Sequence, residues 1–327
     1  MPTRRPFLAA LLASLFTVPA LAQPTSYPNR TVRLIVAFAP GGPTDILARV
    51  VATGLGRALG QQVIVDNRAG SGGTLGTREA ARATPDGYTL IFAGDAALSV
   101  QPQLGGAAAG YDAQKDFTPL RLVASQANVL VVNASKGITD IPTLIARAKA
   151  RSGAIAFGSA GSGSPSHLVG ALFESQTGID MLHVPYKGAA PAMTDLLGGQ
   201  VDALFVGTPV ALQMAGRKEL LMLAITGDRR NRDLPNVPTF AEAGVRGLGS
   251  ETSIWWAVMG PAGLPPAVTS RLESALEATL ADPEVQKGLV TQGVETLNLD
   301  AKTTQQWIAR DQAKWGALIR AKKIAAD

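Results

Sequence analysis

The stretch that decides the fold is Val32-Arg33-Leu34-Ile35-Val36-Ala37-Phe38-Ala39-Pro40-Gly41-Gly42-Pro43-Thr44, an apolar run that leads directly into a Gly/Pro loop. The apolar run is typical of a strand that is buried on both faces. Beyond the loop, apolar residues recur at helical spacing from Ile46 to Leu59, and Gly60 indicates the end of the helix. The stretch therefore predicts a strand, a glycine-rich loop and a helix in direct succession.

The same junction recurs later in the chain. It is clear at 155–165, where an apolar run leads into a Gly/Ser loop, and softer at 69–74 and 185–191. A helix N-terminus leaves backbone N–H groups unpaired and carries partial positive charge, and glycine allows a ligand to approach those groups closely. Several such termini directed at one cleft would bind an anion without a basic side chain. The recurring junction therefore predicts an anion-binding cleft.

The order of the elements predicts an α/β fold. Strand and helix patterns alternate from Val32 to Ala93, which favours a mainly parallel sheet with helices on both faces. Three helices are predicted at the C-terminal end of the chain. In the last of them, at about 301–324, one face carries Trp307, Asp311, Trp315 and Leu318.

Two crossovers divide the chain into two lobes. The apolar stretch Leu120–Val132, interrupted by Ser125-Gln126-Ala127-Asn128, predicts a strand that leaves one lobe and enters the other. The apolar run at 253–259 predicts the return. We therefore expect residues 23–124 and 253–327 to form the first lobe and residues 125–252 to form the second, each lobe being a mainly parallel sheet flanked by helices.

The N-terminal residues have the three parts of a secretory signal peptide. Arg4 and Arg5 form the positive start, residues 7–18 the short apolar run, and Ala20-Leu21-Ala22 a cleavage site before Gln23. The apolar run is too short to span a bilayer. A buried N-terminal helix is the alternative, and the presence of all three parts in order argues against it. We expect an exported, periplasmic protein from which residues 1–22 are removed.

The composition excludes several classes of function. The chain has no cysteine, which excludes disulfides, thiol catalysis and a lipid-modified cysteine anchor. The formal net charge of +5 suggests an anionic ligand or merely good solubility. The densest basic run, Arg229-Arg230-Asn231-Arg232, lacks interleaved aromatic residues and lies between Asp228 and Asp233. A solvated loop is favoured there, and no nucleic-acid partner is expected.

The sequence contains no recognisable set of catalytic residues. The two histidines, His167 and His183, have no cysteine or carboxylate partner at metal-binding spacing. There is no Gly-x-Ser-x-Gly elbow and no phosphate-binding loop, and the run Gly70–Gly76 is mis-spaced for a dinucleotide fingerprint. We therefore expect neither an enzyme nor a cofactor.

Nine sequence blocks, in order along nearly the whole mature chain, carry a family resemblance. Two of the most specific are Pro40-Gly41-Gly42-Pro43-Thr44-Asp45 and Gly161-x-Gly163-Ser164-x-Ser166-His167-Leu168. The other seven blocks are 27–28, 65–73, 85–90, 184–188, 195–202, 234–244 and 261–265. Through these blocks the chain resembles the periplasmic solute-binding receptors of the tripartite tricarboxylate transporter type, also called the Bug family of Bordetella.

The resemblance implies a type II periplasmic binding protein whose two lobes close on a ligand like a Venus flytrap. Ligands in the family are mostly small carboxylates, including dicarboxylates, tricarboxylates, acidic amino acids and aromatic acids. The family holds a carboxylate mainly through main-chain groups and ordered waters at the end of the first strand. The partners implied are the membrane subunits of a tripartite tricarboxylate-type transporter, and we expect a monomer. The alternatives are a receptor that signals to a membrane sensor protein and, least favoured, a secreted enzyme on the same fold.

The chain departs from the family pattern where the distal part of a ligand would lie. Val206 follows Phe205, where the family commonly has an acidic residue, and the stretch 250–256 is only loosely similar. Asp95 is an unusual residue beside an anion site. If its side chain faces the cleft, the ligand would carry an amino group or another donor opposite its carboxylate.

Candidate ligand-binding residues are placed at the predicted junctions and at the crossover. Each has a structural alternative: Gly42 in a tight turn, Thr44 as a helix cap, Phe38 in the core, and His167 in capping or packing. Asp45 is expected to be structural, since a carboxylate in the first helical turn is favourable there. The full set is Phe38, Gly42, Thr44, Asp95, Ala96, Asn128, Gly161, Gly163, Ser164, His167, Tyr186 and Asp202.

Overall fold

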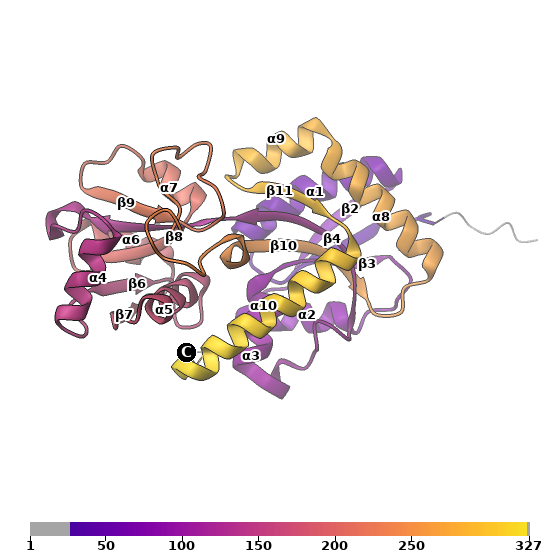
Figure 1. The fold of residues 1–327 in the computed structure, drawn as a ribbon. Helices are drawn as coiled ribbons and strands as arrows, with labels where there is room; N and C mark the ends of the chain where they lie inside the picture. The colour runs from indigo at the N-terminus through magenta and orange to yellow at the C-terminus, as the bar shows by residue number, and fades with distance from the viewer. Residues whose placement is uncertain (1–26, 326–327) are drawn as a thin grey trace, which may run out of the picture.

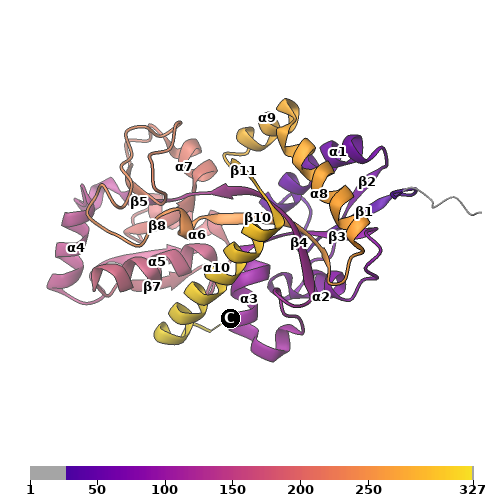
Figure 2. The ribbon, with the colours of Figure 1, turned by 45° about the vertical axis from the view of Figure 1, so that its right-hand side comes forward.

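The computed structural model describes residues 27–325, so the predicted signal peptide lies outside the described part of the chain. Two β-sheets form the centres of two lobes, which Figure 1 shows side by side. The predicted two-lobed α/β fold is confirmed. Figure 2 shows the same two lobes joined by long strands that run between them.

The first sheet has six strands in the order β11-β4-β10-β3-β1-β2. β1 is parallel to β2 and β3, whereas β10 is antiparallel to β3 and β4, and β11 is antiparallel to β4. The strands are β1 (Val32–Val36), β2 (Val63–Asn67), β3 (Thr89–Gly94), β4 (Phe117–Gln126), β10 (Ile254–Pro261) and β11 (Glu295–Leu299).

The second sheet has five strands in the order β7-β6-β8-β5-β9. β6 is parallel to β7 and β8, and β5 is antiparallel to β8 and β9. The strands are β5 (Asn128–Asn133), β6 (Ala156–Ser159), β7 (Leu182–Pro185), β8 (Ala203–Gly207) and β9 (Leu220–Ile225). Both sheets are therefore mixed, and the expectation of mainly parallel sheets is wrong. The reason is that the strands that carry the chain between the lobes run against their neighbours.

Helices flank both sheets. On the six-stranded sheet they are α1 (Pro43–Leu59), α2 (Thr74–Ala81), α3 (Gln101–Gly105), α8 (Pro266–Ala281), α9 (Pro283–Thr291) and α10 (Ala301–Lys322). On the five-stranded sheet they are α4 (Ile141–Ala150), α5 (Pro165–Thr177), α6 (Ala189–Leu197) and α7 (Thr208–Met214). Short helical turns are η1 (Ser71–Gly73), the π-helical η2 (Ala96–Val100), η3 (Gly106–Ala109), η4 (Ala134–Lys136) and η5 (Ser250–Thr252).

The opening junction of the sequence folds as its pattern predicts. Leu34 and Val36 of β1 are buried, and α1 packs Leu47 and Leu55 against them in one hydrophobic cluster. Gly60 ends α1 in the left-handed conformation, with φ 71°, where glycine has no Cβ penalty. The helices α3 and α7, the strand β11 and several helical turns, η2 among them, were not predicted, and all of them are short.

The crossover between the lobes is nearly a continuous strand. β4 ends at Gln126 and β5 begins at Asn128, so Ala127 alone separates the two sheets. β10 brings the chain back, with Ile254 opposite Gln126. The two sheets therefore meet end to end at this point.

The last helix is shared by both lobes. Ile308 in its first half packs against the six-stranded sheet. Trp315 and Ile319 in its second half belong to the hydrophobic cluster of the second lobe, together with Leu168 of α5. The C-terminal half of α10, which the sequence assigned to the first lobe, therefore runs across to α5 and packs on the second (Figure 1).

Candidate ligand-binding site

The predicted glycine loops lie at the edge where the two sheets meet. Gly94, the last residue of β3, is opposite Trp256 at the start of β10, and Gly207, the last residue of β8, is opposite Asn128 at the start of β5. Strands β1 and β3 are parallel, as are β6, β7 and β8. The loops that follow these strands therefore face the other lobe, where ligands bind in open α/β sheets.

Three of the helices that start at this edge lack a side-chain cap, although α5, which also starts here, is capped by Ser164. α1, α2 and α6 have glycine N-caps, Gly42, Gly73 and Gly188, for which the described residues supply no side-chain hydrogen bond. α4, α9 and α10 have aspartate N-caps, Asp140, Asp282 and Asp300, whose side chains accept a backbone N–H. Since an aspartate cap uses up N–H groups and adds negative charge, its absence at this edge leaves the N-termini suited to an anion.

Asp45 holds the loop between β1 and α1 in place. Its carboxylate accepts hydrogen bonds from the Gly41 N–H at 2.9 Å, from Asn67 Nδ2 at 2.9 Å and from Arg49 Nε at 3.0 Å. Burial by itself would raise the pKa of Asp45, but these hydrogen bonds outweigh burial and lower it to about 2. The prediction that Asp45 is structural agrees with these contacts.

Two further contacts shape this loop. The Trp256 indole Nε1 donates a hydrogen bond of 3.0 Å to Thr44 Oγ1, so the returning strand β10 fixes the first turn of α1. Asn67 Nδ2 also donates to the Phe38 carbonyl at 3.0 Å. The Phe38 ring is half-buried beside Gly73, where a Cβ would lie 3.0 Å from the ring. Phe38, Gly42 and Thr44 are therefore brought together at one end of the first sheet.

The corresponding loop of the second lobe has most of its amides already bound. The Gly163 N–H donates to His167 Nδ1 at 3.0 Å, and the Gly161 N–H donates to Ser159 Oγ at 3.2 Å. Ser164 Oγ caps α5 by accepting the His167 N–H at 3.4 Å. The expectation of unpaired N–H groups at Gly161 and Gly163 is therefore wrong, because local side chains accept them. His167 takes the capping role that was its structural alternative.

The remaining predicted residues have internal partners. The Tyr186 hydroxyl donates to Asp195 Oδ2 at 2.6 Å, and burial together with this carboxylate raises the pKa of Tyr186 to about 12. The Asn128 side chain donates to the Thr252 carbonyl at 3.2 Å and joins the two crossover segments. Asp202 precedes β8 and accepts the Ala156 N–H at 2.8 Å. Asp202 therefore lies at the end of the sheet away from the crossover, and is not brought together with the glycine loops.

Comparison with known proteins identifies the family. The model of the tripartite tricarboxylate transporter family receptor matches residues 47–324. The chain belongs to this family. Protein BugT of Bordetella pertussis (strain Tohama I) is 36% identical over 321 residues, which cover 96% of this chain and 96% of BugT. The family consists of periplasmic solute receptors, not enzymes, and a periplasmic location follows for this chain.

Solved structures of similar proteins include two with bound carboxylates. A protein of R. palustris with adipate is 32% identical, with a TM-score of 0.77 over 91% of this chain and 99% of that one. MatC from Rhodopseudomonas palustris with bound malate is 27% identical, with a TM-score of 0.74 over 90% of this chain and 100% of that one. The periplasmic binding protein BugD is 34% identical, with a TM-score of 0.74 over 92% and 100%.

In this family member, Asp95 and Ala96 lie at the end of β3, where η2 begins. Asp95 is 5% exposed, and its charged neighbours are Asp311 and Lys314 of α10. Burial and the nearby Asp311 carboxylate raise the pKa of Asp95 to about 8. Lys314 in turn pairs with Asp311 at 2.8 Å, and Trp255 Nε1 donates to Asp311 at 3.0 Å. Asp95 is therefore buried against α10, and the charged groups nearest to it belong to that helix.

Replacement of Asp95 by asparagine is expected to flatten the pH dependence of stability. Because folding raises the pKa of Asp95, the stability that this group contributes is complete below about pH 4 and is lost as the pH rises to about 8. Asparagine does not titrate. The free energy of unfolding of the variant, relative to the wild type, should therefore increase between about pH 5 and about pH 8 in urea titrations. A difference that stays constant over this range contradicts the raised pKa.

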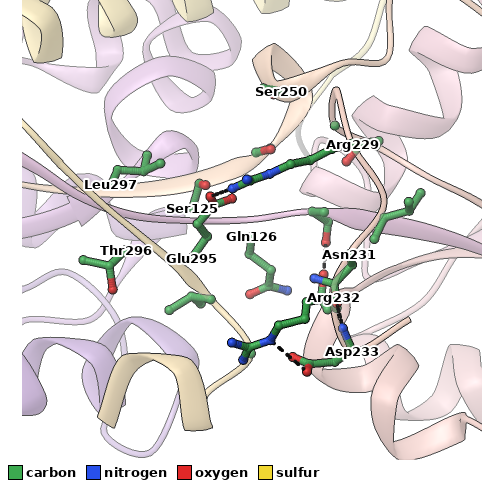
Figure 3. Close-up of a pocket in the computed structure, with 18 of the residues that line it drawn as sticks. Ser125, Gln126, Arg229, Asn231, Arg232, Asp233, Ser250, Glu295, Thr296 and Leu297 are labelled. Atoms are coloured by element: carbon green, nitrogen blue, oxygen red, sulfur yellow. Dashed lines mark hydrogen bonds and ion pairs between the residues drawn. The ribbon is translucent and has the colours of Figure 1, made fainter. Parts of the chain in front are cut away.

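A space between the two lobes lies beside the crossover segment 125–127. It is a cavity of about 970 Å³ between residues 225–233 of the second lobe and the segment from α9 to β11 of the first. Figure 3 shows Arg229 reaching Glu295 across it and Arg232 beside Asp233. Arg230 pairs with Glu242 at 2.9 Å. These arginines are exposed, as the sequence predicted, but the cavity they line was not predicted.

The positive and negative side chains around this cavity balance one another. Each of the three arginines in the run has a carboxylate partner, so the cavity has no excess of cationic groups with which to attract an anion. Among residues 27–325, no group of His, Cys, Asp and Glu side chains could hold a metal ion. Within residues 27–325, no helix is both long enough and apolar enough to cross a membrane. The glycine loops therefore remain the better candidate for ligand binding.

Proposed function

We propose that this receptor binds a small carboxylate between its lobes and delivers it to a membrane transporter of the tripartite tricarboxylate type. Residues 38–44 of the first lobe and the N-terminus of α6 in the second would contact the ligand. Export with cleavage before Gln23, which the mass of the periplasmic protein would reveal, is part of the same proposal. The adipate and malate complexes of similar proteins support the ligand class.

The observation that carries the proposal is the conformation of Gly42. Its φ of −79° and ψ of 166° are open to any residue, and a Cβ would meet nothing closer than the Ala39 carbonyl oxygen at 3.6 Å. The fold therefore does not require glycine at this position. Close approach of a ligand to the backbone at the N-terminus of α1 is a reason for glycine that the fold does not supply.

Gly41 provides the matched contrast. Its φ of 82° lies in the left-handed region, so the turn requires glycine there, although a Cβ would have open space. We expect Gly42→Ala to unfold like the wild type and to bind malate or adipate at least about tenfold more weakly, equivalent to about 1.4 kcal/mol. Gly41→Ala should instead lower stability by about 1 kcal/mol.

The test is calorimetric titration of residues 23–327 with malate and adipate, accompanied by thermal unfolding. A ligand present at about one hundred times its dissociation constant should stabilise the wild type by about 2.7 kcal/mol. The uncharged diamide of adipic acid is the control and should not bind. Wild-type affinity in Gly42→Ala would contradict the proposed contact. Loss of solute uptake in cells that lack the receptor, restored by the wild type and not by Gly42→Ala, would test delivery to a transporter.

A further inference from the structure

The short helix α3 (Gln101–Gly105) occupies a central place that its sequence does not suggest. It follows β3 and η2, so it belongs to the first lobe by connectivity. In both ribbon views it lies next to α10 on the side of the first lobe that faces α5 (Figures 1 and 2). It is thus the part of the first lobe that comes close to the glycine loop at 161–164 of the second.

Three side chains of α3 each fill the space beside a glycine. Gln101 lies where a side chain at Gly72 would be, and Gln103 does the same at Gly316 of α10. Leu104 Cδ1 lies 2.6 Å from the position that a Cβ would take at Gly163. Gly72 belongs to the glycine loop at 69–74 of the first lobe, and Gly163 to the glycine loop at 161–164 of the second. One short helix therefore contacts both loops.

The contact of Leu104 crosses the boundary between the lobes. Leu104 is half-buried and packs, with the fully buried Val100, against the hydrophobic cluster of the second lobe. Gly163 has a φ of 72°, and its N–H is held by His167 Nδ1 from within its own lobe. Leu104 presses on the same residue from the other lobe. Leu104 is therefore in contact with both the 161–164 loop and the core of the second lobe.

We infer that Leu104 is a positioning residue for ligand binding, which acts by holding the two lobes together through its contact with the 161–164 loop and the core of the second lobe. This inference rests on the proposed function. The leucine has no polar group to offer a carboxylate, so it acts through the closed arrangement of the lobes. When the lobes separate, the apolar contact is lost, which favours the closed arrangement in proportion to the area that Leu104 buries. A ligand that binds only the closed arrangement gains affinity from this contact.

The absence of cysteine from the chain allows a direct test of lobe closure. Spin labels can be attached at Ile64→Cys on β2 and Leu182→Cys on β7, whose native side chains are 42% and 55% exposed on different lobes. In this labelled background we would compare Leu104→Ala, Leu104→Met and the control Leu221→Ala, which removes a surface leucine of β9. The readouts are the interlobe distance distribution and the affinity for malate and adipate by calorimetry.

The expected result is specific to Leu104. Leu104→Ala should shift the distances toward longer values and weaken binding about fivefold or more. Leu104→Met should keep the distances and the affinity close to those of the wild type, because methionine fills a similar volume. Leu221→Ala should leave the distances and the affinity unchanged. Unchanged distances in Leu104→Ala, or weaker binding that Leu104→Met does not restore, overturn the inference.

The two proposals fail in different ways. If the wild type binds neither malate nor adipate, that result counts against the proposed ligand class, and the distances in the ligand-free protein still decide the role of Leu104. If the wild type binds and Leu104→Ala binds equally well, the proposed function stands and the inference about Leu104 is wrong.

Discussion

Replacement of Asp45 by alanine is expected to lower the free energy of unfolding by about 2 kcal/mol and to abolish measurable carboxylate binding. The side chain is 2% exposed and accepts hydrogen bonds from Gly41, Arg49 and Asn67. Its removal takes the acceptor from the Gly41 N–H and one of the two acceptors from Asn67 Nδ2, which keeps the Phe38 carbonyl, and the loss of such bonds lowers stability. Urea unfolding measures the first effect and calorimetry the second.

The pH dependence of stability distinguishes the effect of the Asp45 charge from the effect of the side chain's shape. Because the fold lowers the pKa of Asp45 to about 2, its contribution is present at neutral pH and is lost as the pH falls from about 4 toward 2. Asp45→Asn keeps the shape and one acceptor oxygen but not the charge. We expect it to lose less than Asp45→Ala at about pH 7 and to approach the wild type in acid. Wild-type stability of Asp45→Ala at neutral pH would show that the loop does not depend on this side chain.

Replacement of Trp315 by alanine is expected to lower the free energy of unfolding by about 4 kcal/mol. Trp315 lies in the second half of α10, is 2% exposed and packs in the hydrophobic cluster of the second lobe. Its truncation would open a cavity where α10, which begins on the first lobe, packs on the core of the second lobe. Urea unfolding followed by circular dichroism measures the loss.

Two variants control this prediction. Trp307→Ala removes the same residue type from the same helix at a half-buried position and should cost about half as much. Trp315→Phe should cost less than about 1.5 kcal/mol, because the Nε1 of Trp315 is buried without a hydrogen-bond partner among the described residues. Equal losses for Trp315→Ala and Trp307→Ala would contradict the shared role of α10.

Much of the fold could be predicted from local patterns. The junction at 32–44 combines an apolar run with a glycine at a left-handed turn, and the structure has β1, the loop and α1 there. The crossover at 125–128 is marked by polar residues within an apolar strand, and the sheets divide at Ala127. Such features depend on residues within one turn or one strand of each other. The short elements α7, β11 and α3 carried too few residues for a periodic pattern.

The candidate site could be predicted only in part. Gly42, Thr44 and Phe38 lie together because they follow one strand. The internal bonds of Gly161 and Gly163 join residues two and four positions apart, so the nearby Ser159 and His167 were signals that could have been used. The displaced position of Asp202 depends on the direction of β8, which the sequence pattern leaves open.

By itself, the sequence determined the succession of strands, glycine loops and helices and the point at which the chain passes between lobes, because periodicity and backbone conformation are properties of neighbouring residues. Tertiary structure decided that Asp95 faces Asp311, that α10 joins both lobes, and that Leu104 meets Gly163. These groups are far apart along the chain. Their contacts depend on how the sheets and helices pack. Only that packing places the Asp95 carboxyl group beside another acidic group and the Leu104 side chain beside a glycine.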